Sequence, residues 1–371
     1  MFHTYTKKII LSLLLPLSLC AQAQVQQSLH TSEKPLTSVT TIFGTCQLEH
    51  AVIKDLIKHK AMRRLKEIDQ HGPSTFFLHQ PTFNRFEHSV GVFHLLKKFH
   101  APFKEQVAGL LHDASHTVGS HVADTLFKTG RGNAYQDNIH NWFLEKMGVD
   151  TVLKRHGLTI EAVSPKDDSF KALERKLPDL CADRIQYNLH TGLVFGRITE
   201  QDVTTITNDL VFENDEWFFV NQKSARMLAD LSVYFTEFFW GSAENVALHH
   251  WFSTALKRAL ALGLITFDNI HFGTDAEVLK ILRESKDSVI QDMLICLEKP
   301  ADHFKAFEDT TRFDLFCRPK FMVVNPLVKH EGKLVRLTQL DPDFKKEYER
   351  MKEFVRKGHK IRFTTARAKS A

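Results

Sequence analysis

The sequence has little cysteine, and after its first segment no apolar run is long enough to span a membrane. Five cysteines occur in 371 residues, none in a CxxC pair, which argues against a zinc knuckle. One of them, Cys20, lies in the first segment. The others leave two alternatives open, up to two disulfides in an exported protein or buried free thiols, at Cys46, Cys181, Cys296 and Cys317.

Net charge, tyrosine and tryptophan are also low. The formal net charge is +5, and loss of Lys7 and Lys8 with the first segment lowers it, which disfavours a nucleic-acid binder. Only the basic tail KGHKIRFTTARAK, residues 357–369, could contact nucleic acid, and the alternative for it is a solvated C-terminus. In contrast, 30 Phe against 4 Trp and 5 Tyr predict a sizeable apolar core. Neither repeats nor low-complexity tracts occur.

The first 23 residues are typical of an export signal. MFHTYTKK is basic, IILSLLLPLSLC is apolar but short for a membrane span, and AQA is a small-x-small cleavage site. We therefore expect a signal peptide at 1–23 and an exported mature protein, periplasmic or secreted; the alternative is a retained N-terminal anchor. Leu19 before Cys20 argues against a lipoprotein box.

Apolar residues recur at helical spacing through most of the remaining chain. The pattern predicts helices at 90–99, 103–112, 135–147 and 221–240, among others. It also covers 170–193, where Pro178 must interrupt the helix or stand at its start. Near the end, KFMVVNPLVK and KLVRLTQLD favour strands around a Glu331–Gly332 turn.

These patterns predict an all-α helical core with a small α+β C-terminal appendage. We expect a linker at 24–41, the helical domain at 42–300, the α+β subdomain at 301–358 and a basic tail at 359–371.

Histidines gather in one apolar stretch, RFEHSVGVFHLLKKFHAPFKEQVAGLLHDASHTVGSH. It contains His88 and the adjacent pair His112 and Asp113. Further along, Asp183 in LCADRIQYNLH lies at the edge of an apolar stripe, where a carboxylate needs a partner. Two imidazoles and two carboxylates suit one divalent metal ion and do not choose among Mn, Fe, Ni, Zn and Mg.

Other side chains of the same stretch suit phosphate chemistry. A divalent ion polarises a phosphoryl group and lowers the pKa of its bound water. His116 would share the face of His112 if the helix continued, and could act as general acid or base. His121 could bind a phosphate oxygen, and Arg85 could clamp a phosphate with two hydrogen bonds.

Taken together, these motifs resemble the HD-domain metal-dependent phosphohydrolases. The resemblance covers about residues 42–350 and is closest to the branch of SAM-and-HD-domain dNTP triphosphohydrolases and bacterial dGTPases. The stretches that carry it are IFGTCQLEH, MRRLKEIDQHG, NRFEHSVGV, AGLLHDASHTVGSH, CADRIQY, PKFMVVNPLV and GKLVRLTQLD. Residues 24–41 are too few for a SAM domain.

The resemblance implies an HD-domain fold and a role for each matching residue. It implies metal ligands at His88, His112, Asp113 and Asp183. It implies a phosphate-binding arginine at Arg85 and active-site histidines at His116, His121 and His140. Substrate contacts would fall on Gln70 and Tyr187.

The chain also departs from this branch. Asn141 follows His140 where the branch usually has Glu. Gln186 stands where it has Asp, and residues 188–191 differ from its Arg-x-Asp-like segment, which helps to hold sugar and phosphates. The di-iron HD-GYP phosphodiesterases resemble the chain less, since they carry Lys at the position of His116. The pair His249 and His250 is interpreted as ordinary helix residues.

The sequence therefore predicts a metal-dependent phosphohydrolase acting on a nucleotide or related phosphate ester. Triphosphohydrolase, phosphomonoesterase and cyclic-nucleotide phosphodiesterase activities remain open. The alternative is a catalytically altered protein on the same scaffold that binds or senses nucleotides. We expect a small-molecule partner and no nucleic-acid or membrane partner, and a homo-oligomer is left open.

Overall fold

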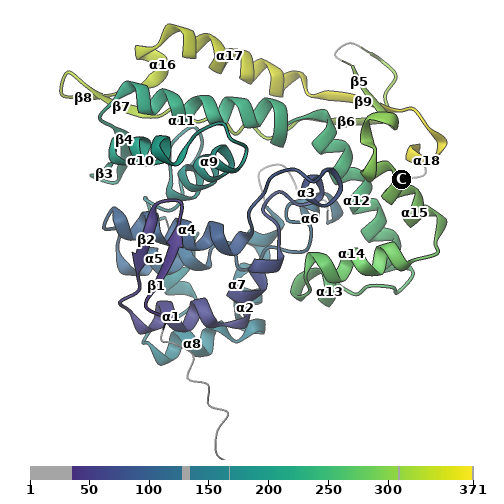
Figure 1. Cartoon of the computed structure of the whole chain (residues 1–371), viewed down its shortest axis with the longest axis horizontal. Coiled ribbons are helices and arrows are strands. Elements are labelled where there is room, and N and C mark those ends of the chain that lie inside the picture. Colours follow the sequence, from purple (N-terminus) through teal and green to yellow (C-terminus); the bar gives the residue numbers. More distant parts are fainter. Residues whose placement is uncertain (1–35, 128–133, 167, 308–309, 370–371) are drawn as a thin grey trace, which may run out of the picture. The chain divides into compact units, whose positions relative to one another are not determined.

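The computed structural model describes residues 36–127, 134–166, 168–307 and 310–369 (Figure 1). The signal peptide predicted at 1–23 lies outside the described residues, as does most of the linker predicted at 24–41. Residues Thr37–Ala371 belong to one unit of mutual contacts, and that unit is described by itself.

Helix α4 (Arg85–Lys98) is the central element of the N-terminal half. It begins in a capping box, in which Asn84 and Glu87 satisfy each other's backbone amides. Most of its side chains are buried, because α5 (Phe103–Leu111) and α9 (Ala182–Val194) both pack against it. The other helices of this half are α1 (Ala51–Lys58), α2 (Lys60–Arg64), η1 (Leu65–Glu67), α3 (Pro73–Leu78), α6 (Val122–Leu126), α7 (Tyr135–Met147), α8 (Val149–Arg155), η2 (Glu161–Val163) and α10 (Glu200–Asn208).

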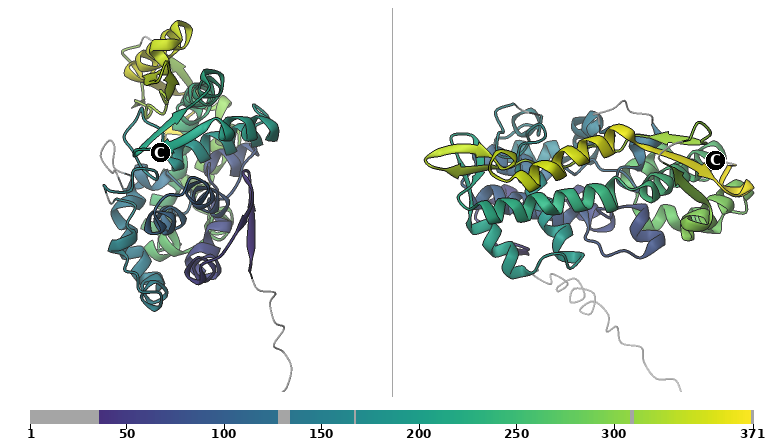
Figure 2. Two further views of the ribbon diagram at one scale, coloured as in Figure 1. Left: turned by 90° about the vertical axis from the view of Figure 1, so that its left-hand side faces the viewer. Right: turned by 90° about the horizontal axis from the view of Figure 1, so that it is seen from above.

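Helix α12 (Ala243–Ala261) has the same role in the second half. It buries a row of apolar side chains, Trp251 and Phe252 among them, against α15 (Ser288–Glu298), α6 and α3. Before it, α11 (Gln222–Phe235) continues into a π-helical turn, η3 (Thr236–Trp240). Helix α17 (Pro342–Lys357) lies along α11, as Figure 2 shows. The remaining helices are α13 (Phe267–Phe272), α14 (Asp275–Glu284), η4 (Pro300–Asp302), α16 (Leu337–Leu340) and α18 (Ala366–Lys369).

Three small sheets complete the described part of the chain. The first is a hairpin of β1 (Ser38–Thr41) and β2 (Gly44–Gln47). The second has the order β3 (Leu210–Glu213), β4 (Glu216–Phe219), β7 (Leu327–His330) and β8 (Lys333–Arg336), with β4 and β7 parallel. In the third, β9 (His359–Phe363) lies between β5 (Phe304–Phe307) and β6 (Leu315–Cys317).

The predicted fold class, an all-α core with a smaller α+β part, is confirmed. Helix α7 has the predicted bounds, and β7 and β8 meet at the predicted turn, where Glu331 and Gly332 both have positive φ. The boundary expected between residues 300 and 301 stays a prediction. Within the described residues, no helix has both the length and the apolar character that a membrane span requires.

The helix predicted from residue 170 begins only at Ala182. Ahead of it, the Glu105 carboxylate accepts hydrogen bonds from the amides of Ala172 and Leu173, at 2.7 and 2.8 Å. The carbonyl of Ala172 accepts a further bond from the Trp217 indole at 2.9 Å. The Ala172 carbonyl also accepts the amide of Ala182 at 2.8 Å, so it is taken up by groups other than the amide four residues ahead that a helix would supply. Pro178 has no amide hydrogen and cannot continue a helix through this segment, which stays a loop.

Two segments expected to lack regular structure contain strands. Strand β1 lies at the end of the predicted linker, and the predicted basic tail contains β9 and α18. Ile361 in β9 is fully buried, because it pairs with both Ala306 and Leu315 on neighbouring strands. Strands β1 and β9 are four and five residues long, which is too short for the apolar pattern to predict them.

Three of the cysteines are free thiols in the interior: Cys46, Cys181 and Cys296. Burial raises the pKa of each thiol, that of Cys296 to about 11. The disulfide alternative therefore does not hold for these three residues.

Candidate metal centre

The four predicted metal ligands lie on three segments that pack together: helix α4, the end of α5, and the start of α9. His88 lies one turn into α4, where the capping box sets the start of the helix. His112 follows the last residue of α5 with helical backbone angles, so Asp113 is the first side chain beyond that helix. Asp183 lies in the first turn of α9. Contacts of α4 with both other helices bring these segments together.

Nitrogen and oxygen atoms of these four side chains converge. The Nε2 atoms of His88 and His112 are 3.1 Å apart. Asp183 Oδ1 lies 3.0 Å from His88 Nε2 and 3.6 Å from His112 Nε2. The second carboxylate is that of Asp113, whose Oδ1 lies 3.5 Å from His112 Nε2. His88, His112 and Asp183 meet the spacing of a metal-binding cluster, and Asp113 adjoins them.

Hydrogen bonds fix which imidazole nitrogen of each histidine is free. His112 Nδ1 is 2.8 Å from the carbonyl oxygen of Gly109, so it carries the proton and donates. His88 Nδ1 contacts Oε1 of Gln186 in the same way. These partners place a proton on Nδ1 of both rings, so the two Nε2 atoms face the shared centre and can give their lone pairs to a metal ion.

The electrostatics of the site favour a cation at this centre. Burial alone would lower the pKa of His112, yet the carboxylates of Asp113 and Asp183 raise it to about 9. Burial would raise the pKa of Asp113, but Arg85 and the surrounding histidines hold it well below its usual range. A buried carboxylate, a partly exposed carboxylate and two imidazole Nε2 atoms therefore favour a cation at this centre, either a proton on His112 or a divalent metal ion, and this mixed donor set does not select one metal.

The structure places Arg85 beside the ligands instead of in open space. Its side chain is 1% exposed, and Nη1 donates to Asp113 Oδ2 at 2.5 Å. Nε donates to the Ser120 hydroxyl at 2.7 Å, and Nη2 contacts the carbonyl of Gln70 at 3.4 Å. Arg85 thus orients Asp113 in this structure, and the phosphate contact stays a prediction.

His116 and His121 lie next to each other in the loop that follows α5. Their rings meet edge to face at 5.0 Å. His116 is buried, with Nε2 3.2 Å from Asp113 Oδ1 and with Nδ1 unpartnered. Burial, reinforced by the charge of Arg85, lowers its pKa to about 3, so the ring is neutral at pH 7. His121 is half exposed.

A residue missed by the sequence reasoning orients His121. Asp124 Oδ2 lies 3.4 Å from His121 Nδ1, and Oδ1 accepts the backbone amide of Tyr135 at 2.7 Å. Although burial would raise the pKa of Asp124, the His121 contact and the Tyr135 amide lower it to about 2. The i, i+3 spacing of the two residues was the available signal.

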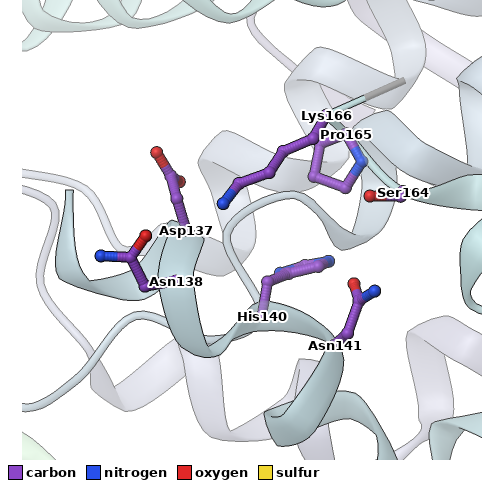
Figure 3. Close-up of a pocket in the computed structure, with 7 residues that line it drawn as sticks. All are labelled: Asp137, Asn138, His140, Asn141, Ser164, Pro165 and Lys166. Carbon is purple, nitrogen blue, oxygen red and sulfur yellow. The ribbon is translucent and has the colours of Figure 1, made fainter. Parts of the chain in front are cut away.

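His140, on α7, lines a pocket of about 170 Å³ (Figure 3), and the charges of His112 and Asp113 act on its ring. The Ser115 hydroxyl lies 3.0 Å from His140 Nδ1 and donates to the carbonyl of Gln136, so Nδ1 carries the ring proton. The opposite nitrogen, Nε2, is buried without a partner. Burial, together with the nearby His112, lowers the pKa of His140 to about 4, so Nε2 is an available proton acceptor at pH 7.

The pocket also brings His140 near polar groups that no motif indicated. Lys166 extends across it from the loop after η2, opposite His140 and Asn141. Asp137, Asn138 and Ser164 complete its polar lining. Asn141, which departs from the related branch, therefore faces the same pocket as His140.

The two predicted substrate residues have buried polar atoms without partners. These atoms are Oε1 of Gln70 and the hydroxyl oxygen of Tyr187. The Tyr187 ring packs edge to face on Trp240 at 5.2 Å. His71, which the sequence reasoning passed over, also has an unpartnered Nε2 and lies among Phe83, Phe195 and Phe239.

Comparison with known protein sequences gives several relatives. No family model matches the chain. YdhJ, an uncharacterised protein of Bacillus subtilis, is 30% identical over 319 residues, which is 85% of this chain and 96% of that protein. The metal-dependent phosphohydrolase cns2 of Cordyceps militaris is 34% identical over 171 residues, 46% of this chain and 48% of cns2. The deoxynucleoside triphosphate triphosphohydrolase SAMHD1 homolog of Dictyostelium discoideum is 29% identical over 119 residues, 26% of this chain and 23% of that protein.

Solved structures share the fold. A phosphohydrolase from Bacteroides thetaiotaomicron superposes with a TM-score of 0.67 at 15% identity, over 87% of this chain and 98% of that one. A hypothetical protein from Aquifex aeolicus gives a TM-score of 0.62 at 15% identity, over 85% and 98%. The shared fold, the sequence relatives and the convergent donors together define the class of this protein. The chain belongs to the HD-domain superfamily of metal-dependent phosphohydrolases.

Proposed function

We propose that this chain hydrolyses a nucleotide or a related phosphate ester, using one divalent ion held by His88, His112, Asp113 and Asp183. The observation that carries the proposal is the convergence of these four donors, with Nε2 of both histidines facing the shared centre. When bound, a divalent ion in such a donor set polarises a phosphoryl oxygen and lowers the pKa of the attacking water.

The residues around these donors have separate roles in the proposal. His140 moves a proton at Nε2, because Ser115 holds its other nitrogen protonated. His116 and Arg85 keep Asp113 oriented from two sides. His121, oriented by Asp124 and half exposed, contacts the departing phosphate group.

Buried polar atoms on the substrate side support a nucleotide. Hydrogen bonds from a sugar or base would satisfy Oε1 of Gln70 and the Tyr187 hydroxyl, which have no partner among the residues that the structure describes. The name of the Dictyostelium relative makes deoxynucleoside triphosphates the first compounds to test. The departures at residues 186–191 keep monophosphates and cyclic nucleotides in the same test.

The test is hydrolysis by the mature full-length protein, stripped of metal and reloaded with Mn²⁺, Fe²⁺, Ni²⁺, Zn²⁺ or Mg²⁺. Each metal form is incubated with dNTPs, NTPs, nucleoside monophosphates and cyclic nucleotides. Chromatography of the nucleoside products separates triphosphate release from monophosphate cleavage. The proposal predicts metal-dependent product from at least one class, and no turnover with any metal would overturn it.

A second candidate, a nucleotide sensor without turnover, is favoured by one observation. Asn141 stands in the His140 pocket where a carboxylate is usual in the related branch. A sensor would bind a nucleotide in equilibrium dialysis and leave it intact, whereas the enzyme would release product. The Asn141→Glu variant would gain turnover only if the missing carboxylate limits the reaction.

For the compartment, we propose that residues 1–23 direct export and that the mature enzyme works outside the cytoplasm. The basic start, short apolar run and AQA site support it. A reporter fused after residue 40 should appear outside the cytoplasm, and deletion of residues 2–23 should retain it inside.

A further inference from the structure

Gln186 is a fully buried amide that none of the predicted site roles uses. It lies on α9 one turn after Asp183, and its relative exposure is 0%. Both ends of its amide have a partner. Oε1 contacts His88 Nδ1, and Nε2 lies 3.1 Å from His190 Nδ1.

The chain leaves a space for this amide at a single glycine. A Cβ atom on Gly91, in the middle of α4, would lie 2.5 Å from Gln186 Nε2 and 2.9 Å from Gln186 Cγ. Any side chain at position 91 would therefore push Gln186 away from His88. The close approach of α4 and α9 at Gly91 is what lets a residue of α9 reach the far side of a metal ligand.

The orientation of the amide decides which nitrogen of His88 is free. An oxygen facing Nδ1 requires a proton on Nδ1 and leaves the Nε2 lone pair bare. The reverse orientation would set an NH₂ group against Nδ1 and move the ring proton to Nε2. Nε2 lies 3.1 Å from His112 Nε2 and 3.0 Å from Asp183 Oδ1, where a metal ion needs a lone pair.

His190 selects the productive orientation. Its Nδ1 accepts from the Gln186 NH₂ group, which turns the oxygen toward His88. The His190 ring is itself fixed by stacking on Phe83, with ring centroids 3.6 Å apart and planes 15° from parallel. Phe83 precedes the capping residue of α4, so the chain of contacts returns to the helix that carries His88.

We propose that Gln186 is a positioning residue of the metal centre: its amide, oriented by His190, holds His88 in the tautomer that presents Nε2 to the ion. Outer contacts of this kind typically change metal affinity by about 10- to 100-fold when they are removed. The inference rests on the metal-dependent function proposed above but concerns metal binding, which is measured without substrate.

The test measures Co²⁺ affinity of the full-length mature protein at fixed pH, by competition with a chromophoric chelator. Gln186→Met keeps the length of the side chain and removes the acceptor, and should weaken Co²⁺ binding by about 10- to 100-fold. Gln186→Glu restores an acceptor and should bind Co²⁺ at least as tightly as the parent. His190→Phe keeps the stacking on Phe83 and should have a smaller effect of the same sign.

A matched control lies two residues further along α9. Asn188 is equally buried, and its amide donates to the carbonyl of Arg184 at 2.8 Å and to no metal ligand. Asn188→Leu should shift the unfolding temperature and leave Co²⁺ affinity and the visible Co²⁺ spectrum unchanged. Equal weakening by Gln186→Met and Asn188→Leu would show a general packing effect and overturn the proposal.

The remaining outcomes separate this inference from the proposed function. If Gln186→Met folds and binds Co²⁺ as tightly as the parent, the positioning role is wrong while hydrolysis can still stand. If the affinities change as expected but no substrate turns over, the hydrolase proposal fails and the inference stands. If the parent binds no Co²⁺, the inference fails, and the substrate panel with the other metals still decides the hydrolase proposal.

Discussion

The two sides of the catalytic region differ in how completely the protein satisfies its own polar atoms. On the metal side, three of the four ligand side chains have a second contact: Gly109, Gln186 and Arg85 hold His112, His88 and Asp113. On the substrate side, polar atoms of Gln70, His71, Tyr187 and His140 are buried without partners. We infer that the chain preorganises the metal side, and we propose that a bound ligand would complete the substrate side.

This difference has a structural origin. The metal ligands stand at helix ends or within helices whose mutual packing fixes them. Gln70 and His71 come from the turn before α3, and the aromatic side chains around them are held by ring contacts. Substitutions on the metal side should therefore abolish activity, and substitutions on the substrate side should reduce it only in part.

The largest effect is expected on removing a ligand. Asp183→Asn keeps the shape of the side chain and removes its charge, so metal content should fall and turnover should drop by about a thousandfold or more, because the ion supplies several kcal/mol. Elemental analysis and kinetics check this. Asp202→Asn, a helix-cap change on α10, is the control and should retain metal and turnover. Unchanged metal content in Asp183→Asn would refute the assignment.

His140 lies between the two sides, and its substitution tests whether it transfers a proton in the reaction. His140→Gln should lower kcat by about 100-fold or more with metal content unchanged, because general acid–base catalysis typically contributes that much. Asn141→Ala changes the neighbouring residue of the same pocket and should cost less than about tenfold. A rise in KM with unchanged kcat would instead make His140 a binding residue.

His71, on the substrate side, should make the folding stability depend on pH. Burial, with the charge of Arg85 in the same direction, lowers its pKa to about 3, against an ordinary 6.5 in the unfolded chain. Below pH 6.5 the unfolded state takes up a proton that the folded state refuses, so stability falls as pH falls. His71→Phe, which suits its aromatic surroundings, should remove about 2 kcal/mol of the loss between pH 7 and pH 5. Denaturant titrations at both pH values measure it, and an unchanged loss would contradict the burial argument.

The smallest effect is expected at Tyr187. Tyr187→Phe removes a hydroxyl that has no partner in the described part of the chain, so the unfolding temperature should stay the same or rise. Substrate should bind less tightly by about fivefold, which corresponds to about 1 kcal/mol for one hydrogen bond. A lower unfolding temperature with unchanged KM would place the hydroxyl partner within the fold and remove Tyr187 from the substrate side.

Sequence patterns predicted what depends on helix spacing and failed where distant segments meet. The bounds of α7 and the grouping of His88, His112, Asp113 and Asp183 follow from local periodicity and motif order. Gln186 was interpreted only as a departure from a related pattern. Its contact with His88 depends on the approach of two helices at Gly91, which no local pattern records.

Loops show the same limit. Residues 170–181 have helical periodicity, but the carbonyl of Ala172 accepts from the Trp217 indole and the Ala182 amide in place of a helical partner. Ser115 and Asp124 orient His140 and His121 through single hydrogen bonds, and such partners are ordinary residues in the sequence. Chemistry-bearing residues are thus easier to predict than the residues that aim them.

The position of β9 bears on the order in which the chain can fold. β5 and β6 come earlier in the sequence, yet each pairs only with β9 in their sheet. During synthesis, both strands leave the ribosome with open edges and wait for a later segment. A chain shortened before His359 would keep the metal ligands but expose two unpaired strands, which makes truncated products candidates for aggregation and proteolysis. Tags intended to leave folding undisturbed are therefore better placed before β1 than within the segment from His359 to Lys369.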